Sequence, residues 1–359
     1  MTTNGDLEDV ARVIVGVDTH LDEHVAVAID GLGARLGEYR LPTTLKGYEG
    51  LDRWAAGLGE AVAFGIEGTG SYGAGLARHL AGRGRTVIEV NRPDRSTRRR
   101  LGKSDPVDAE MAARAVLAGV AKDYPKSGLD NVEMIRMLKI VKDSAIKART
   151  QAINQMKALI VTAPVELRYK LTGLTVRRLV ACCGSFRPGR LATPAAATKH
   201  ALRLLARRHS HLNSEIEGVD KELVWLTAEI APALVHTFGV GADTAATLLV
   251  TAGSNPERLR SEPAFAALCG VNPIPASSGK TDRHRLNRGG DRQANAALYR
   301  VVLVRRRYDE RTREYMRRRT TEGMTKPEII RCLKRYVARQ VFAILRETGR
   351  KNLALPAAA

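Results

Sequence analysis

Four acidic residues in the first third of the sequence have the types and positions to do chemistry together, namely Asp18, Glu67, Asp105 and Asp108. Asp18 and Glu67 each end an apolar run, where an ionised carboxylate is seldom buried without a partner. Carboxylates brought close together raise one another's pKa unless a cation neutralises them. Oxygen ligands suit Mg²⁺, and two metals held this way stabilise both oxygens of an in-line phosphoryl displacement. We therefore expect a magnesium site, in which Mn²⁺ is a possible substitute.

Asp105 and Asp108 also make a strong helix start, with Asp105 at the N-cap and Pro106 at the first helical position. Taken alone, the two carboxylates could simply cap the helix and interact with its dipole. Their spacing also puts both at one end of the helix, where they can face Asp18 and Glu67. The four acids together favour the metal site.

The segment after Glu67 contains Gly68, Gly70 and Gly73, and Glu89 follows about 20 residues on. This spacing matches the fingerprint of a dinucleotide-binding fold. The antiparallel opening of the chain disfavours that fold. The alternative is that the glycines let a nucleic-acid backbone approach Glu67 closely.

The elements that must position the acids follow a β-β-β-α-β-α-β-α order. We expect strands at 12–18, 25–29, 34–41, 62–67 and 86–90, and helices at 48–58, 74–83 and 108–117. The order mixes an antiparallel meander with crossover connections. It predicts an α/β fold of the RNase H-like class, whose first strand supplies Asp18 and whose fourth supplies Glu67.

Beyond this region the sequence is mainly helical. Two long helical patterns, at about 132–161 and 195–230, flank an irregular Gly/Pro segment. They suggest a helical hairpin that bridges domains or subunits, or else a single α-helical subdomain. Further on, Gly239 and Gly241 resemble a helix-hairpin-helix turn that meets a DNA phosphate, although a tight helix turn explains them almost as well.

Charge is the outlier of the composition. The 359 residues carry 58 Lys and Arg against 38 Asp and Glu, a net charge of +20 with a pI near 10.2. That balance indicates an anionic partner, most simply nucleic acid, and no apolar stretch is long enough to span a membrane. The start of the sequence lacks signal-peptide features, and the four cysteines show neither disulfide nor zinc spacing. We expect a cytoplasmic, nucleoid-associated protein.

Basic residues gather just before the last two acids and after a serine-containing loop. The residues expected to bind nucleic acid are Arg92, Arg95, Arg98, Arg99, Arg100, Lys103, Lys280, Arg283, Arg285 and Arg288. A run of charges is usually a solvated face. The run from Arg92 to Lys103, however, adjoins the expected metal site, so we expect it to hold the phosphates of the nucleic acid. Ser278, in the loop, is a candidate nucleophile towards phosphate, whereas a turn serine is the default interpretation.

The acids and the serine loop together resemble a known family. The chain resembles the DEDD transposases of the bacterial insertion-sequence family that includes the Piv-type invertases. The residues that carry the resemblance are Asp18, Glu67 and the Asp105-x-x-Asp108 pair, together with a later segment from Cys269 to Gly279. The resemblance covers about 13–345. It implies a RuvC-like domain at 10–122, a coiled-coil-like helical linker at 129–232 and a mainly α-helical C-terminal transposase domain at 233–350.

The same resemblance implies roles. Asp18, Glu67, Asp105 and Asp108 would bind Mg²⁺, and Ser278 would attack a DNA phosphate to give a phosphoserine; Ser277 is adjacent, so the assignment could differ by one. Donor and target duplex DNA, a structured non-coding guide RNA and a homodimer or tetramer with composite active sites are the implied partners. This RNA-guided serine recombinase competes with a Mg-dependent endonuclease like a Holliday-junction resolvase, which uses water, and with a non-catalytic binder.

Overall fold

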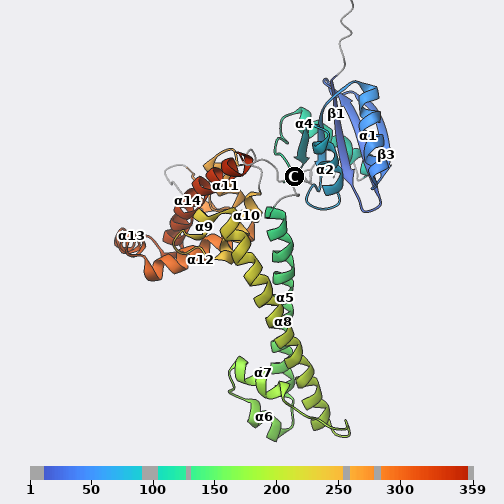
Figure 1. The fold of residues 1–359 in the computed structure, drawn as a ribbon. Coiled ribbons are helices and arrows are strands. Elements are labelled where there is room, and N and C mark those ends of the chain that lie inside the picture. The colour runs from blue at the N-terminus through green and yellow to red at the C-terminus, as the bar shows by residue number, and fades with distance from the viewer. Residues whose placement is uncertain (1–11, 91–103, 127–130, 254–258, 279–283, 355–359) are drawn as a thin grey trace, which may run out of the picture. The chain divides into compact units, whose positions relative to one another are not determined.

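The computed structural model describes residues 12–90, 104–126, 131–253, 259–278 and 284–354 (Figure 1). The chain divides into two compact units. The first comprises residues 1–130 with 253–260, and the second comprises 131–252 with 261–359. The domain division at 232/233 that the sequence suggests stays a prediction.

The first unit is built on a five-stranded mixed sheet. Its strands are β1 (Arg12–Thr19), β2 (Glu23–Asp30), β3 (Arg35–Pro42), β4 (Glu60–Glu67) and β5 (Val87–Val90). Their order across the sheet is β3-β2-β1-β4-β5. The first three strands pair antiparallel, whereas β4 runs parallel to β1 and β5 parallel to β4. Consequently β1 and β4 end side by side at one edge.

Helices cover both faces of this sheet. Helices α1 (Leu45–Leu58) and α2 (Ala74–Gly82) pack with alternate strand residues into one apolar core. Helix α4 (Asp105–Leu117) packs on the opposite face, against Ile14, Val27 and Ile29. Because both faces of β1 and β4 are covered, their side chains read as continuous apolar runs. The expected mixed α/β unit is confirmed.

The second unit is mostly helical, as expected from the sequence. Its longest helices, α5 (Asn131–Val161) and α8 (Pro194–Ile230), run side by side along much of their length (Figure 1). Buried residues recur at three-, four- or seven-residue intervals along α5, the spacing of a packed helix pair, and α8 repeats these intervals over most of its length. Between them lie helices α6 (Val165–Leu171) and α7 (Val176–Gly184), which the sequence pattern does not predict.

The remainder of this unit packs around the other end of α5 and α8. Its elements are α9 (Pro232–Val235), α10 (Ala242–Ala252), α11 (Glu262–Leu268), β6 (Pro273–Pro275), β7 (His284–Leu286), α12 (Arg292–Tyr308), α13 (Glu310–Thr321) and α14 (Lys326–Ala354). Strands β6 and β7 form an antiparallel pair that the sequence did not predict. No helix within the described ranges is long and apolar enough to cross a bilayer.

Candidate functional site

The ends of β1 and β4 bring two of the four acids to one edge of the sheet. Val17 on β1 is in register with Ile66 on β4, so Asp18 and Glu67 follow at neighbouring positions. The Thr19 hydroxyl donates a hydrogen bond to the Glu67 carbonyl oxygen at 2.9 Å, which joins the two strand ends. Both acids are buried, each with 8% of its surface exposed.

Two glycines let α4 approach this edge closely. Gly16 and Gly65 are register partners in the β1–β4 pair. A Cβ on Gly16 would lie 2.0 Å from the Ala109 carbonyl oxygen, and one on Gly65 would lie 2.7 Å from a methyl of Val116. Any larger residue at Gly16 would push the helix backbone away from the sheet. The glycine pair therefore sets where the first turn of α4 lies.

That first turn carries the other two acids in different environments. The N-cap residue of α4 is Ser104, whereas the sequence predicted Asp105, so the helix begins one residue earlier than expected. Asp105, Pro106 and Asp108 all lie in its first turn. Asp108 is 2% exposed, whereas the Asp105 side chain is 44% exposed. Asp108 is therefore buried, and Asp105 stays accessible to solvent.

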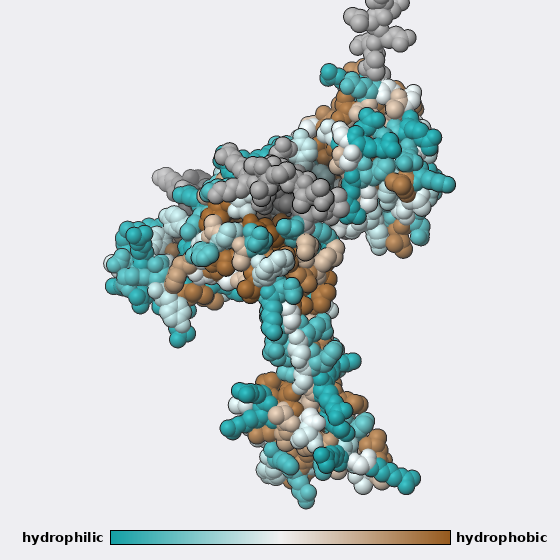
Figure 2. All heavy atoms as spheres, in the orientation of Figure 1, coloured by the Kyte–Doolittle hydropathy of each residue, from teal (hydrophilic) through white to brown (hydrophobic). Residues whose placement is uncertain are grey.

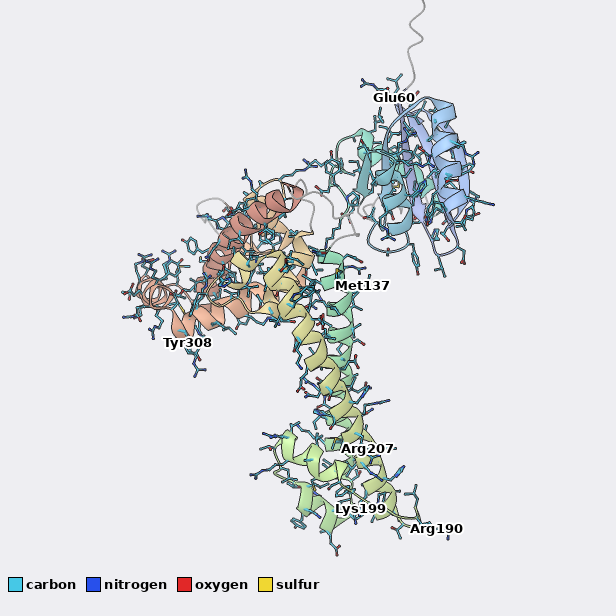
Figure 3. The ribbon with its side chains drawn as sticks, in the orientation of Figure 1. Glu60, Met137, Arg190, Lys199, Arg207 and Tyr308 are labelled. Atoms are coloured by element: carbon cyan, nitrogen blue, oxygen red, sulfur yellow. The ribbon has the colours of Figure 1, made fainter. Side chains whose placement is uncertain are left out.

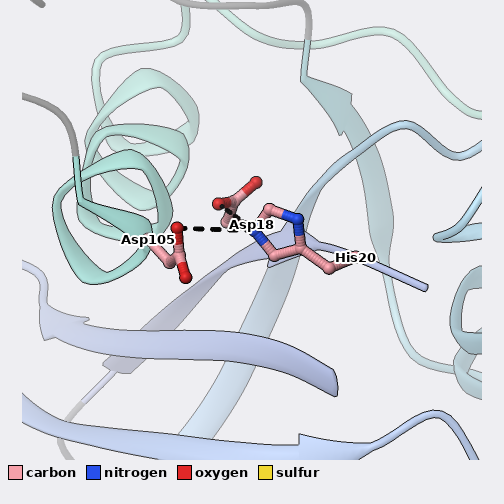
Figure 4. A group of neighbouring side chains, drawn as sticks. All are labelled: Asp18, His20 and Asp105. Atoms are coloured by element: carbon pink, nitrogen blue, oxygen red, sulfur yellow. Dashed lines mark hydrogen bonds and ion pairs between the residues drawn. The ribbon is translucent and has the colours of Figure 1, made fainter. Parts of the chain in front are cut away.

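His20, which is not among the residues predicted from the sequence, is part of the same cluster. Its Nε2 lies 3.1 Å from an Asp18 carboxylate oxygen and 3.5 Å from an Asp105 oxygen (Figure 4). Its position relative to Asp18 could have indicated it, because His20 is two residues after Asp18, and residues i and i+2 of an extended segment point to the same face. The imidazole lies between the two carboxylates and is 52% exposed at its side chain.

Electrostatics shows that the acids act on one another. Burial is the main cause that raises the pKa of Asp18; His20 opposes it, and the negative charges of Asp108 and Asp105 raise it further. Such a site favours binding of a cation, since a cation relieves both the burial cost and the mutual repulsion.

The donor set fits a divalent cation. Asp18, His20 and Asp105 each offer one ligand atom, and these atoms lie within 4.8 Å of one another. Asp108 adds negative charge from the same helix turn, and Glu67 borders Asp18 on the adjacent strand. Carboxylate oxygens suit Mg²⁺ and Mn²⁺, while the imidazole is a nitrogen donor that the sequence-based ligand set lacked.

Ser278 lies in the second unit, three residues beyond β6. Ser277 and Ser278 are both exposed, so exposure does not distinguish them. Of the residues expected to bind nucleic acid, Arg285 lies on β7 and Arg288 just after it, and both are exposed. The others lie outside the described residues: Arg92, Arg95, Arg98, Arg99, Arg100, Lys103, Lys280 and Arg283.

An open groove of about 710 Å³ lies beside the β6–β7 pair. Arg285 lines it together with several cations of α14, among them Arg331 and Arg339. Lys334, also in its lining, donates to the Asn295 side-chain oxygen at 2.8 Å, and burial together with Arg331 lowers its pKa. The groove is therefore cationic and adjoins the serine loop along the chain.

The glycines at 239 and 241 lie between α9 and α10. Gly239 has a φ of +85°, and a Cβ there would lie 3.3 Å from the Val301 carbonyl oxygen of α12. The turn thus packs against another helix. The positive φ and the close packing are enough to explain a glycine at 239, as the tight-turn interpretation predicts. Phosphate binding by this turn stays a prediction.

Comparison with known proteins places these residues in two family matches. Residues 15–163, which contain all four acids, match a model described as a transposase of the DEDD IS110 type. Residues 231–317, which contain Ser278, match a model described as a transposase of the IS116/IS110/IS902 family. The two matches occur in chain order and do not overlap.

A protein of Streptomyces coelicolor described as the "Insertion element IS110 uncharacterized 43.6 kDa protein" is similar over part of the chain. The two are 32% identical over 120 residues, which is 33% of this chain. The matched part spans 29% of the length of that relative.

Proposed function

Since the chain belongs to the IS116/IS110/IS902 family of transposases, enzymes that cut and rejoin DNA, we propose that it catalyses the strand cleavage and exchange that move an insertion sequence. The observation that carries the proposal is the gathering of carboxylates where β1, β4 and α4 meet. Asp18 and Asp105 lie around one histidine nitrogen there, and Asp108 raises the pKa of Asp18.

In this proposal Asp18, Glu67, Asp105 and Asp108 hold Mg²⁺, which Mn²⁺ can replace. A divalent cation bound there supplies positive charge that stabilises both the attacking and the leaving oxygen of a phosphoryl displacement. The buried acids fix the charge of the site, and the exposed Asp105 and His20 form its open side towards solvent. The sheet order β3-β2-β1-β4-β5 supports an RNase H-like, RuvC-like arrangement of this unit.

Ser278 is the proposed nucleophile. Its hydroxyl oxygen bonds to a DNA phosphorus while a phosphorus–oxygen bond of the strand breaks, leaving a phosphoserine and a free hydroxyl end. The exposed position of Ser278 and the cationic groove beside β6 and β7 support this role, because the groove can hold the flanking phosphates. The acids belong to the first unit and the serine to the second.

The remaining partners are proposed from the family resemblance. Donor and target duplex DNA are the substrates, a structured non-coding RNA guides them together, and a homodimer or tetramer forms composite sites from the acids of one copy and the serine of another. The net charge of +20 supports an assembly that binds more than one nucleic acid.

A second candidate function is a Mg-dependent endonuclease like a Holliday-junction resolvase, in which water attacks the phosphate. One observation favours it: all four acids lie in the first unit, so the acid site forms without Ser278. In that case Ser278 would be a loop residue with no part in the chemistry.

Trapping a covalent protein–DNA adduct separates the two functions. Full-length protein is incubated with labelled insertion-sequence ends and Mg²⁺, then denatured and separated by electrophoresis. We expect an adduct with the wild type and with Ser277→Ala, and none with Ser278→Ala, which should still bind DNA. Cleavage without any adduct would support the hydrolase, and strand exchange by Ser278→Ala would overturn the serine mechanism.

A further inference from the structure

Between Asp143 and Glu215 lie 71 residues that contain a single acid, Glu166. We call residues 144–214 the tip; it comprises the end of α5, α6, α7 and the first half of α8. With 38 acids in 359 residues, a stretch of this length would contain about seven at the average frequency of the chain. The tip holds 13 Lys and Arg, a formal charge of +12, so it is the depletion of acids that makes it cationic.

No ion pair involves any cation of the tip, all of whose residues the structure describes. These cations are Lys147, Arg149, Lys157, Arg168, Lys170, Arg177, Arg178, Arg187, Arg190, Lys199, Arg203, Arg207 and Arg208. Elsewhere on α5, by comparison, Arg136 pairs with Glu133 and Lys142 pairs with Asp243. What distinguishes the tip is that all of its cations lack an ion pair over a stretch with a single acid.

The charges are displayed on a scaffold with its own core. Apolar residues from all four helices pack together there, including Met156, Leu167, Leu179 and Leu202. Figure 3 shows the labelled side chains of Arg190, Lys199 and Arg207 in this part of the molecule, away from Met137 at the other end of α5, and much of its surface in the view of Figure 2 is hydrophilic. Because the helices of this scaffold are already packed, binding need not order the backbone that carries the cations.

The tip also contains an open groove of about 820 Å³ between α5, α7 and α8. Arg149, Arg177 and His209 line it together with hydroxyl and amide side chains. Arg149 donates to the Asn213 side-chain oxygen at 2.6 Å, which holds the guanidinium in place. Burial and the charge of Arg149 lower the pKa of His209. The positive potential of the groove therefore comes from Arg149 and Arg177, and it suits a phosphate.

We propose that the tip is a binding surface for the phosphate backbone of duplex DNA, separate from both the acid site and the groove beside β7. The tip has two aromatic residues, and Phe186 packs against the apolar core, which leaves Tyr169 as its single exposed aromatic side chain. Surfaces for single-stranded nucleic acid stack successive bases on several aromatic side chains, so the tip favours a duplex. DNA rather than RNA follows from the DNA substrate of the proposed function, and this choice rests on it.

Helix geometry gives the reach of this surface. Along α8, His209 and the last residue, Ile230, are 21 positions apart, which corresponds to about 32 Å at 1.5 Å per residue. That is close to one turn of B-DNA, about 34 Å. The tip therefore holds DNA well away from the half of the second unit that carries Ser278, and it can anchor a stretch that the chemistry does not touch.

The test measures duplex binding against salt. A labelled 30-base-pair DNA is titrated with full-length wild type and with the triple variant Arg149→Gln, Arg177→Gln, Arg207→Gln, by fluorescence anisotropy from 50 to 200 mM KCl. Each lost phosphate contact should reduce the slope of log affinity against log salt by about 0.9. Over this range the wild type should lose up to about 40-fold more affinity than the variant.

Arg136→Gln is the matched control, because it removes one charge from the same helix where Glu133 already neutralises it, and its salt slope should equal that of the wild type. Melting curves verify that all variants are folded. The proposal is overturned if the triple variant binds duplex DNA as the wild type does. It is also overturned if the triple variant loses affinity only for duplex RNA of the same sequence. Failure of the proposed catalysis would appear instead as undiminished cleavage by Asp18→Asn, with the salt effect of the tip intact.

Discussion

Two aspartates, one in each unit, sit in clusters of charged groups that shift their pKa values in opposite directions. Burial and neighbouring acids raise the pKa of Asp18. Hydrogen bonds from Lys139 and Lys142 overcome burial at Asp243 and lower its pKa to about 2. The lysine nitrogens lie 2.8 and 2.6 Å from an Asp243 oxygen, and Arg300 lies 3.3 Å from the other oxygen.

The signs of the neighbouring charges separate groups that stabilise the fold from groups that are placed to bind a ligand. Asp243 on α10 meets cations from α5 and α12, so its network ties three helices together with both signs present. Asp18 meets acids from α4, and the only cation-forming group beside it is the partly exposed His20 among the described residues. A cluster of one sign is incomplete until something of the other sign binds.

Replacing Asp18 or Asp243 by asparagine should give the largest effects that distinguish the two clusters. Asp18→Asn should lower DNA cleavage by about 1000-fold, the upper range for removing one charge-stabilising group. Its metal-free melting temperature should not fall, because a repelling charge has gone. Asp243→Asn should do the reverse, leaving cleavage by the folded protein within a few-fold of wild type.

The stability loss of Asp243→Asn should be about 2 kcal/mol in urea unfolding, below the 3–5 kcal/mol typical of a broken buried pair. The discount reflects the 31% exposure of Asp243 and the second partner of Lys142, which is Asp220. If Asp18→Asn melted lower while Asp243→Asn abolished cleavage without unfolding, the assignment of the two clusters would be reversed.

The acid cluster depends on close helix packing, and Gly16→Ala tests that dependence. The new Cβ would meet the backbone of α4, so the helix must shift and carry Asp105 and Asp108 away from Asp18. A displacement of about 1 Å should cost about 100-fold in cleavage, and overpacking about 1–3 kcal/mol in stability. Gly31→Ala is the control, since no atom lies within 4 Å of its Cβ position. Equal cleavage by the two variants would contradict this role for Gly16.

The sequence predicted the acid cluster because its parts are local. Asp18 and Glu67 follow apolar runs that could only be buried strands, and Asp105 to Asp108 is a helix start whatever surrounds it. His20 was not predicted, because a histidine two residues from an acid is common in sequences and does not by itself indicate a site. The pairing of Asp18 with Glu67 needed the parallel register of β1 and β4, which the element order made plausible.

The rest could not be read from the sequence, because it depends on partners far apart in the chain. Lys139 and Asp243 are 104 residues apart, and neither carries a local sign of the other. Helices α6 and α7 are 7 and 9 residues long, too short to be stable alone, and form on the tip core. Ser278 was singled out by its loop and by resemblance, and its role stays a prediction.

The smallest expected effect is the pH dependence of the Asp243 network. Its pKa is depressed in the folded state, so its contribution to stability is present above the unfolded value of about 4 and is lost as the pH falls towards about 2. The groups facing it are Lys139, Lys142 and Arg300, and Asp220 also pairs with Lys142.

The difference in unfolding free energy between wild type and Asp243→Asn should therefore be constant above about pH 5 and shrink steadily below about pH 4. Urea unfolding followed by circular dichroism between pH 3 and 6 measures it. Asp143→Asn, on the more exposed acid that lies 3.5 Å from Lys139, should show a smaller difference throughout. A difference that grows as the pH falls would mean that the fold raises the pKa of Asp243, as it raises that of Asp18. The contrast between the two clusters would then fail.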